Sequence, residues 1–134
     1  MFNGASYDGE LDLHKWDVSK VTNFNNFGYG AKISSFNFSG WNLESLSNVT
    51  TSAALLKYGS DQTKYIDCSN WNLPLVTQVP NIVESLPEGT INCSNWNLPS
   101  IKMLYNTNST SATFVFGTRT SNTASAKKLD CSGW

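Results

Sequence analysis

The sequence is poor in charge, and this scarcity excludes several classes of function. The 134 residues include only 9 Lys or Arg and 10 Asp or Glu, for a net charge of −1. Nucleic-acid binding by a basic surface needs clustered Lys and Arg, so we expect no nucleic-acid partner. No apolar run approaches the roughly 20 residues of a membrane-spanning helix, so we expect no membrane span here. Asn, Ser and Thr supply the polarity instead, which favours an extracellular or cell-surface location, or alternatively a virion.

Residue types that carry catalysis or bind metals are also scarce. The single histidine is His14, so a catalytic triad for acyl transfer would rest on it alone. No glycine-rich loop that could cradle a phosphate is present. The three cysteines have no companion histidine or second cysteine pair that would complete a tetrahedral metal site. We therefore expect no enzymatic activity, no cofactor and no metal.

One motif recurs five times and contains every tryptophan of the chain. Its clearest copies are IDCSNWNLP at 66–74 and INCSNWNLP at 91–99, and looser copies lie at 11–18, 36–43 and 129–134. Numbering each copy from its first apolar residue, the sixth position is Trp16, Trp41, Trp71, Trp96 and Trp134. Successive tryptophans are 25, 30, 25 and 38 residues apart. A repeat of this period predicts an array of stacked units.

The first three positions of the motif predict a β-strand. Positions one and three are apolar and position two is always Asp or Asn, and such alternation is typical of a half-buried strand. Ser or His and then Gly, Asn or Lys follow, which indicates a bend. Apolar residues return at positions six, eight and eleven. One unit cannot bury these residues alone, whereas parallel strands stacked about 4.8 Å apart can, with right-handed crossovers between them.

The tryptophans are predicted to form a structural ladder beneath the sheet. Each buried indole removes roughly 150–250 Å² from water, which makes the column a large stabilising contribution. We expect each indole N–H to donate a hydrogen bond to a backbone carbonyl of a neighbouring unit. The cysteines Cys68, Cys93 and Cys131 all hold position three, which favours free thiols that fill the core; a Cys68–Cys93 disulfide is the alternative.

The segments that return between copies are predicted to contain short helices and loops. Residues 47–58 are the best helix candidate, and 80–86 form a second one. Phe24 and Phe27 are spaced to dock a single helical turn. Residues 60–65 and 106–112 are predicted loops, and 113–116 a short extended segment.

These motifs resemble the BspA-type leucine-rich repeats of bacterial surface proteins. The similarity lies in MFNGAS at 1–6, in residues 11–23 and in each later tryptophan motif. The resemblance implies a leucine-rich-repeat-like right-handed solenoid, with a parallel β-sheet on one face and short helices and loops on the other. It covers residues 1–134 as a single repeat domain of about five partial or complete repeats. Because both ends look cut, we expect a segment of a longer repeat protein.

The outward positions two and four form the candidate binding face. Position two is Asp12, Asn37, Asp67, Asn92 and Asp130, and position four is His14, Ser39, Ser69, Ser94 and Ser132. One interpretation is a polar face that recognises protein or glycan. The other is a solvated ladder in which Asn separates the Asp residues and so avoids like-charge contact. Asn between the carboxylates also disfavours a calcium cage or a hydrolytic carboxylate pair.

Three functions are compatible with these patterns. The first is a non-enzymatic adhesion module, because the BspA resemblance implies attachment to host proteins or other cells. The second is a structural or assembly element of a filament, fibre or virion, joined to neighbouring subunits through its exposed strand edges. The third, a solenoid enzyme that degrades polysaccharides, needs a cluster of catalytic side chains that the sequence does not supply.

Overall fold

The computed structural model describes seven stretches of the chain, and all statements below refer to them. They are residues 1–24, 27–47, 55–57, 62–78, 83–84, 89–102 and 128–134. The predicted loop at 106–112 and the predicted extended segment at 113–116 lie outside them.

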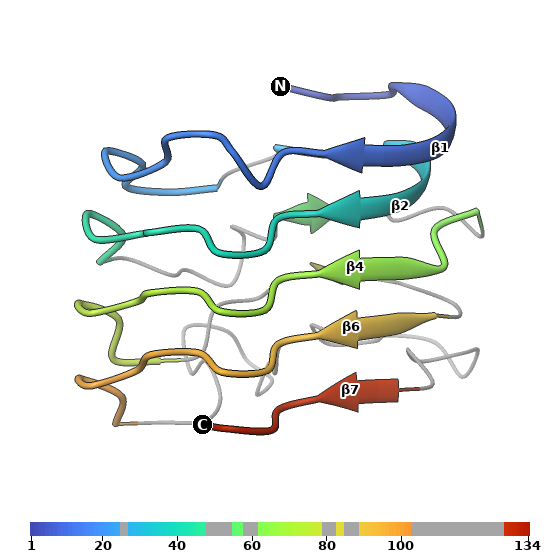
Figure 1. The fold of residues 1–134 in the computed structure, drawn as a ribbon. Helices are drawn as coiled ribbons and strands as arrows, with labels where there is room; N and C mark the ends of the chain where they lie inside the picture. Colours follow the sequence, from blue (N-terminus) through green and yellow to red (C-terminus); the bar gives the residue numbers. More distant parts are fainter. Residues whose placement is uncertain (25–26, 48–54, 58–61, 79–82, 85–88, 103–127) are drawn as a thin grey trace.

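Each copy of the motif contributes one strand to a single parallel sheet (Figure 1). The strands run in the order β1-β2-β4-β6-β7. Their bounds are β1 (Ser6–Asp12), β2 (Lys32–Asn37), β4 (Tyr65–Asp67), β6 (Thr90–Asn92) and β7 (Lys128–Asp130). The position-one residues of neighbouring units lie directly beside one another in the sheet, in the pairs Leu11–Phe36, Phe36–Ile66, Ile66–Ile91 and Ile91–Leu129. The predicted parallel stacking of the five copies is therefore confirmed.

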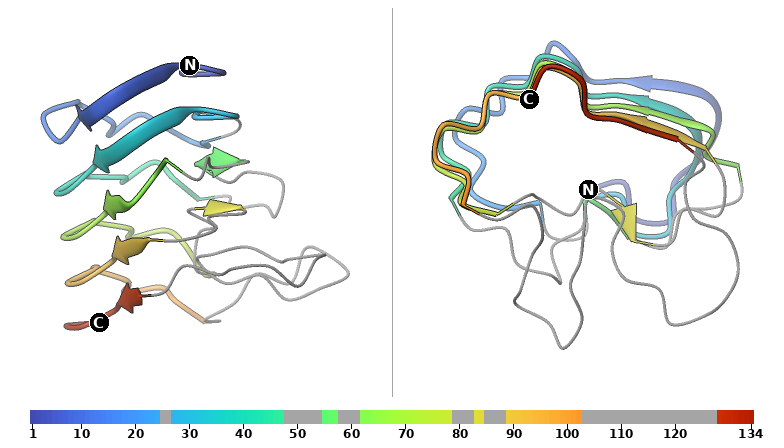
Figure 2. Two further views of the ribbon diagram at one scale, coloured as in Figure 1. Left: turned by 90° about the vertical axis from the view of Figure 1, so that its right-hand side faces the viewer. Right: turned by 90° about the horizontal axis from the view of Figure 1, so that it is seen from below.

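The return side of the units contains a short strand pair where helices were predicted. Strand β3 (Leu56–Lys57) pairs in parallel with β5 (Val83–Glu84), on the side away from the main sheet (Figure 2). The helix predictions for 47–58 and 80–86 are thus wrong at these residues, and the described part of the chain contains no helix. Leu55 accepts a hydrogen bond from the Gly28 amide at 2.9 Å, so the extended chain bonds to a neighbouring unit. Such cross-unit pairing outweighs the helix propensity of the leucines.

The core lies between these two layers and is built from the predicted inward positions. Positions one and three are buried in the second, third and fourth units: Phe36, Phe38, Ile66, Cys68, Ile91 and Cys93. Leu43 and Leu73 at position eight and Leu46 and Val76 at position eleven are buried as well. Phe27 donates its amide hydrogen to the Phe24 carbonyl at 3.0 Å, and Phe24 lies in the core with Phe27 packed against it.

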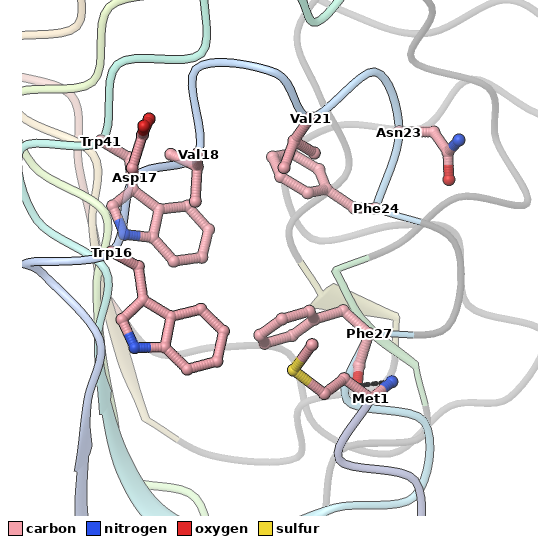
Figure 3. Close-up of a pocket in the computed structure, with 9 residues that line it drawn as sticks. All are labelled: Met1, Trp16, Asp17, Val18, Val21, Asn23, Phe24, Phe27 and Trp41. Atoms are coloured by element: carbon pink, nitrogen blue, oxygen red, sulfur yellow. Dashed lines mark hydrogen bonds between the residues drawn. The ribbon is translucent and has the colours of Figure 1, made fainter.

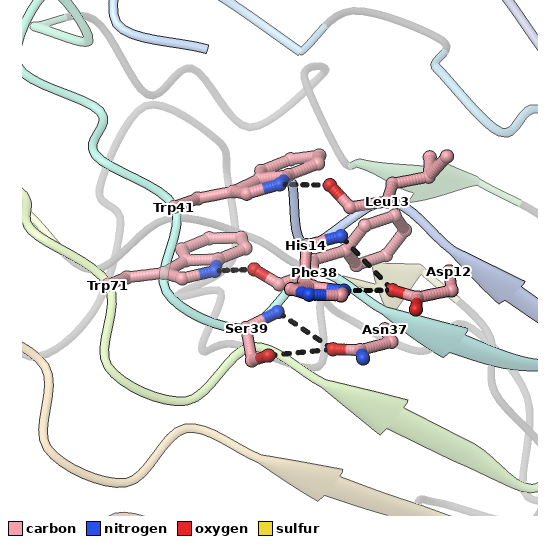
Figure 4. A network of polar contacts seen from close by, with 8 residues as sticks. All are labelled: Asp12, Leu13, His14, Asn37, Phe38, Ser39, Trp41 and Trp71. Carbon is pink, nitrogen blue, oxygen red and sulfur yellow. Dashed lines mark hydrogen bonds and ion pairs between the residues drawn. The ribbon is translucent and has the colours of Figure 1, made fainter. Parts of the chain in front are cut away.

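Four of the five tryptophans form the predicted ladder, whereas Trp16 lies outside it and packs against Phe2 and Phe27. The rings of Trp41 and Trp71, Trp71 and Trp96, and Trp96 and Trp134 are stacked, with centroids 5.7, 5.3 and 5.2 Å apart. In the second to fifth units the indole N–H donates to the position-three carbonyl of the preceding unit, as Trp71 does to Phe38 at 2.6 Å and Trp41 to Leu13 at 2.9 Å (Figure 4). The same bond joins Trp96 to Cys68 and Trp134 to Cys93. The predicted indole-to-carbonyl hydrogen bonds are therefore confirmed.

The bend after each strand explains why position five is Gly or Asn. Gly40 and Gly133 have φ of 70° and 75°, and Asn70 and Asn95 have φ of 58° and 57°. This left-handed region favours Gly, and Asn is among the side chains that tolerate it best. The first unit has Lys15 there and turns differently, through a 3.0 Å hydrogen bond from the Trp16 amide to the Leu13 carbonyl.

Candidate binding face

The register brings the predicted face residues together in two columns on the outside of the sheet. Position two forms one column across β1, β2, β4, β6 and β7, because Asp12 pairs with Asn37, Asn37 with Asp67, Asp67 with Asn92 and Asn92 with Asp130. The position-four residues follow at the bend. Ser69 is buried, at 7% exposure, so this member of the second column does not present its side chain to a partner.

The position-two side chains have a structural role that the sequence analysis did not assign. In every unit the Oδ1 atom accepts a hydrogen bond from the amide two residues later, at 2.9 to 3.2 Å. Figure 4 shows the bond from the Ser39 amide to Asn37, and the Ser39 hydroxyl donates to the same oxygen at 2.7 Å. This is an Asx-turn, which starts the bend after the strand. The Asp and Asn side chains therefore hold the backbone bend in all five units.

We expect Asp67→Asn to leave stability within about 0.5 kcal/mol of wild type, whereas Asp67→Ala lowers it by about 1 kcal/mol. Asn offers the same carbonyl acceptor and already serves in this way at Asn37 and Asn92. Ala leaves the Ser69 amide without its 2.9 Å acceptor. Urea unfolding of the three proteins measures the difference. Equal stability of the Ala and Asn variants would show that the Asx-turn contributes nothing.

His14 and Asp12 form a close pair on the surface. His14 Nδ1 lies 2.5 Å from Asp12 Oδ1, and both side chains are exposed. Hydrogen bonds from the His14 side chain and amide hold the pKa of Asp12 below its usual value. The nearest position-four residue of the next unit, Ser39, donates its hydroxyl to Asn37 and so is not directed at the histidine. The described residues thus do not assemble a nucleophile, base and acid around His14.

Tyr65 is a candidate binding residue that the sequence analysis missed. It lies on β4, the central strand, one residue before position one, and 38% of it is exposed. Its hydroxyl lies 3.4 Å from Asp67 Oδ2, and it also interacts with Asn92. Partial burial raises the pKa of this phenol, while the hydrogen bond with Asn92 opposes the shift. The alternation of the strand was the available signal, because it places residue 65 on the same outer face as residue 67.

A ladder of asparagine side chains runs along the surface just after the tryptophans. Asn72 Nδ2 donates to Asn42 Oδ1, and Asn97 Nδ2 donates to Asn72 Oδ1, both at 2.7 Å. Their backbones also bridge in parallel. This amide ladder is at position seven of the motif and faces solvent.

An apolar pocket of about 330 Å³ opens beside the first unit (Figure 3). Its wall is mostly aromatic and aliphatic, with two polar residues, and consists of Met1, Trp16, Asp17, Val18, Val21, Asn23, Phe24, Phe27 and Trp41. Asp17 accepts a hydrogen bond from the Ser19 amide at 3.0 Å, so its carboxylate also holds a local turn. In Figure 3, Trp16 and Trp41 lie on one side of the opening and the rings of Phe27 and Phe24 lie on the other.

The cysteines are free thiols, and each directly follows one of three neighbouring strands, β4, β6 and β7. Cys68 and Cys93 are buried and Cys131 is half-buried, in agreement with their predicted role as core fillers. Burial raises the pKa of all three thiols, most strongly for Cys68 and Cys93. Within the described stretches, no group of three or more His, Cys, Asp or Glu side chains is placed to hold a metal ion.

Taken together, each repeated sequence unit adds one strand to a parallel sheet, and the second to fifth units each add one indole to a ladder. The chain belongs to the family described as "Mycoplasma protein of unknown function, DUF285", which it matches over residues 1–123. No curated protein and no solved structure matches it. In the described part of the chain, no helix has the length and apolar character needed to cross a bilayer.

Proposed function

We propose that this chain is a non-enzymatic binding module, exposed at the cell surface, that recognises protein or glycan through the outer face of its sheet. In this proposal the units form a right-handed solenoid of the BspA-type leucine-rich-repeat kind. The in-register parallel strands and the family match support it. The low charge and the Asn- and Ser-rich surface support an extracellular location.

The observation that carries the proposal is an exposed tyrosine at the centre of a rigid polar surface. Tyr65 lies on the middle strand, with Asp67 and Asn92 beside it. Tyr offers an apolar ring and a hydroxyl at a small entropic cost, which is why it is enriched where proteins bind partners. Because the Asx-turns and indole bonds fix the backbone, little ordering energy is needed when a ligand binds.

We expect Tyr65→Ala to weaken binding about ten-fold or more, as truncation of a central aromatic residue does in other interfaces. The probes are a panel of purified oligosaccharides and a panel of purified extracellular-matrix proteins, with affinity measured by biolayer interferometry. Saturable binding to one panel identifies the ligand class.

Tyr29→Ala is the matched control, because Tyr29 is equally exposed at 38% but lies in the turn before β2, outside the sheet. It should leave the affinity unchanged. Equal losses in the two variants, or binding that survives in Tyr65→Ala, would count against the sheet face. Replacing Asp67 or Asn92 is a poorer test, because each also holds an Asx-turn.

The alternative function is an assembly element of a filament, fibre or virion. It is supported by β1 and β7, which are the first and last strands of the sheet in the described part of the chain. An edge of this kind can accept a further parallel strand from another subunit.

A further inference from the structure

Tyr65 is held in one position by polar side chains of its own strand and of the next. Its hydroxyl lies 3.4 Å from Asp67 Oδ2 on β4, the middle strand of the sheet (Figure 1), and the phenol also interacts with the Asn92 side chain on β6. Two residues span about 6.6 Å along a strand, so a tyrosine whose hydroxyl reaches the residue two positions later has its ring leaning along the strand. With 38% of Tyr65 exposed, one face of this ring is open to solvent.

The residues on either side of the ring are small. In the sheet register, Ser35 of β2 and Thr90 of β6 lie directly beside Tyr65. Both are partly buried and uncharged, and neither side chain is long enough to cover an aromatic ring. A flat ligand can therefore reach the open face of the ring without displacing a side chain of the neighbouring strands.

A hydrogen-bond acceptor and a donor border the hydroxyl end of the ring. Asp67 uses Oδ1 for its Asx-turn, where it accepts the Ser69 amide at 2.9 Å, so Oδ2 remains at the surface as a charged acceptor. Asn92 uses Oδ1 to accept the amide and the hydroxyl of Ser94, which leaves its Nδ2 group as a donor. The site thus combines one aromatic face with two polar groups that the turns hold in place.

This combination fits a sugar ring better than a protein surface or an anion. A pyranose has a face of C–H groups that can pack on an aromatic ring, and a rim of hydroxyls that both donate and accept. A protein interface buries about 800 Å² on each partner and has several aromatic or Arg residues at its centre. Among positions two and four and the residue before position one, the first four units supply Tyr65 as the one large apolar side chain. The charged side chains at those positions are Glu10, Asp12 and Asp67, with no Lys or Arg, and they disfavour an anionic ligand.

We propose that the Tyr65 site takes a neutral glycan, with the C–H face of one pyranose ring packed on the tyrosine and its hydroxyls bound to Asp67 and Asn92. The proposal rests on the binding function proposed above for the outer face of the sheet, and it narrows the ligand from protein or glycan to an uncharged oligosaccharide. Because the ligand has no charge, added salt should leave the affinity nearly unchanged.

The test uses hexasaccharides of two kinds, titrated into the 134-residue chain by calorimetry. Maltohexaose, cellohexaose, mannohexaose and N-acetylated chitohexaose are the neutral probes, and hexamers of galacturonic acid and of heparin are acidic probes of the same length. At least one neutral probe should bind saturably, and the acidic probes should bind more weakly. Tyr65→Ala should weaken binding of the neutral probe about ten-fold or more, whereas Tyr65→Phe, which keeps the ring, should weaken it about three-fold.

Asp67→Asn tests the hydrogen bonds to the sugar. Asn keeps the Oδ1 acceptor of the Asx-turn, as Asn37 and Asn92 do, but places an N–H donor where Oδ2 was. It should weaken binding of the neutral probe about ten-fold, because a hydrogen bond to a charged acceptor is lost. Asp17→Asn is the matched control, since Asp17 also accepts a backbone amide, that of Ser19, and lies outside the sheet. This control should bind as wild type does.

The outcomes separate this proposal from the function on which it rests. If an acidic hexasaccharide or an extracellular-matrix protein binds in place of the neutral probes, and Tyr65→Ala abolishes that binding, the neutral-glycan proposal is overturned while the binding function of the face stands. If nothing binds, or if binding survives in Tyr65→Ala, both are overturned. A neutral probe whose binding is unchanged in Asp67→Asn, or weakened equally in Asp17→Asn, would overturn the hydrogen bonds assigned to the sugar.

Discussion

Trp71→Ala should lower the free energy of unfolding by about 3–5 kcal/mol, a large share of the stability of a domain of this size. Trp71 is fully buried and stacks on Trp41 on one side and Trp96 on the other, at 5.7 and 5.3 Å. Its removal leaves a cavity between two units and takes the donor away from the Phe38 carbonyl. Because adjacent units contact mainly one another, the loss weakens the whole array. Chemical denaturation monitored by circular dichroism measures it.

Two further variants separate the contributions. Trp71→Phe keeps a ring in the ladder but removes the indole N–H, so its loss should be about 1–3 kcal/mol. Trp16→Ala makes the same truncation at a ring that is 41% exposed and outside the stacked ladder, and should cost about 1–2 kcal/mol. If Trp16→Ala destabilised the protein as much as Trp71→Ala does, the ladder would not be the main source of stability.

The thiols of Cys68 and Cys93 should react with iodoacetamide about 10³-fold more slowly than a free thiol at pH 8, and Cys131 should react far faster than either. Only the thiolate attacks, and burial raises the pKa of Cys68 and Cys93, so almost no thiolate is present and the reagent has no access. Reaction then requires opening of the stack. Mass spectrometry of timed samples gives the three rates. All three thiols should react alike in guanidinium chloride, and rapid labelling of native Cys68 would contradict its burial.

The same pKa shifts predict that the protein loses stability at alkaline pH. In the folded state the buried thiols stay protonated, whereas in the unfolded state they ionise above their ordinary pKa of about 8.5. Their contribution is therefore fully present below about pH 8.5 and declines as the pH rises above it. Thermal unfolding between pH 7 and pH 10.5 should show the decline, and Cys93→Ala should show a shallower one. An identical pH dependence in the two proteins would show that Cys93 is not responsible.

The repeated motif was sufficient to predict the strands, their register and the bonds of the ladder. Strict alternation at positions one to three determines which side chains are buried, and the aligned tryptophans of the second to fifth units determine how those units stack. The return segments were predicted less well. Leu55 and Leu56 favour a helix locally, but the described residues there pair as strands with another unit. No local pattern reports a partner that is 27 residues away in the sequence, as Val83 is from Leu56.

The candidate binding face likewise combines features that the sequence predicts with features that only the structure shows. Its columns of outward side chains were predictable from the alternation of side chains along each strand. The use of each Asp and Asn in an Asx-turn, however, depends on the bend that follows the strand. Tyr65 became a candidate only once β4 was found at the centre of the sheet. The exposed ladder of Asn42, Asn72 and Asn97 likewise depends on how closely the units approach after the tryptophan.

The sequence by itself determined the unit, because burial on one side of a strand and a bend that accepts Gly or Asn are local requirements that recur in every copy. Only the tertiary structure decided what the units do for one another: which carbonyl receives each indole of the ladder and which asparagines bond. Those outcomes depend on distances between residues 25 or more positions apart in the chain, and stacking alone sets these distances.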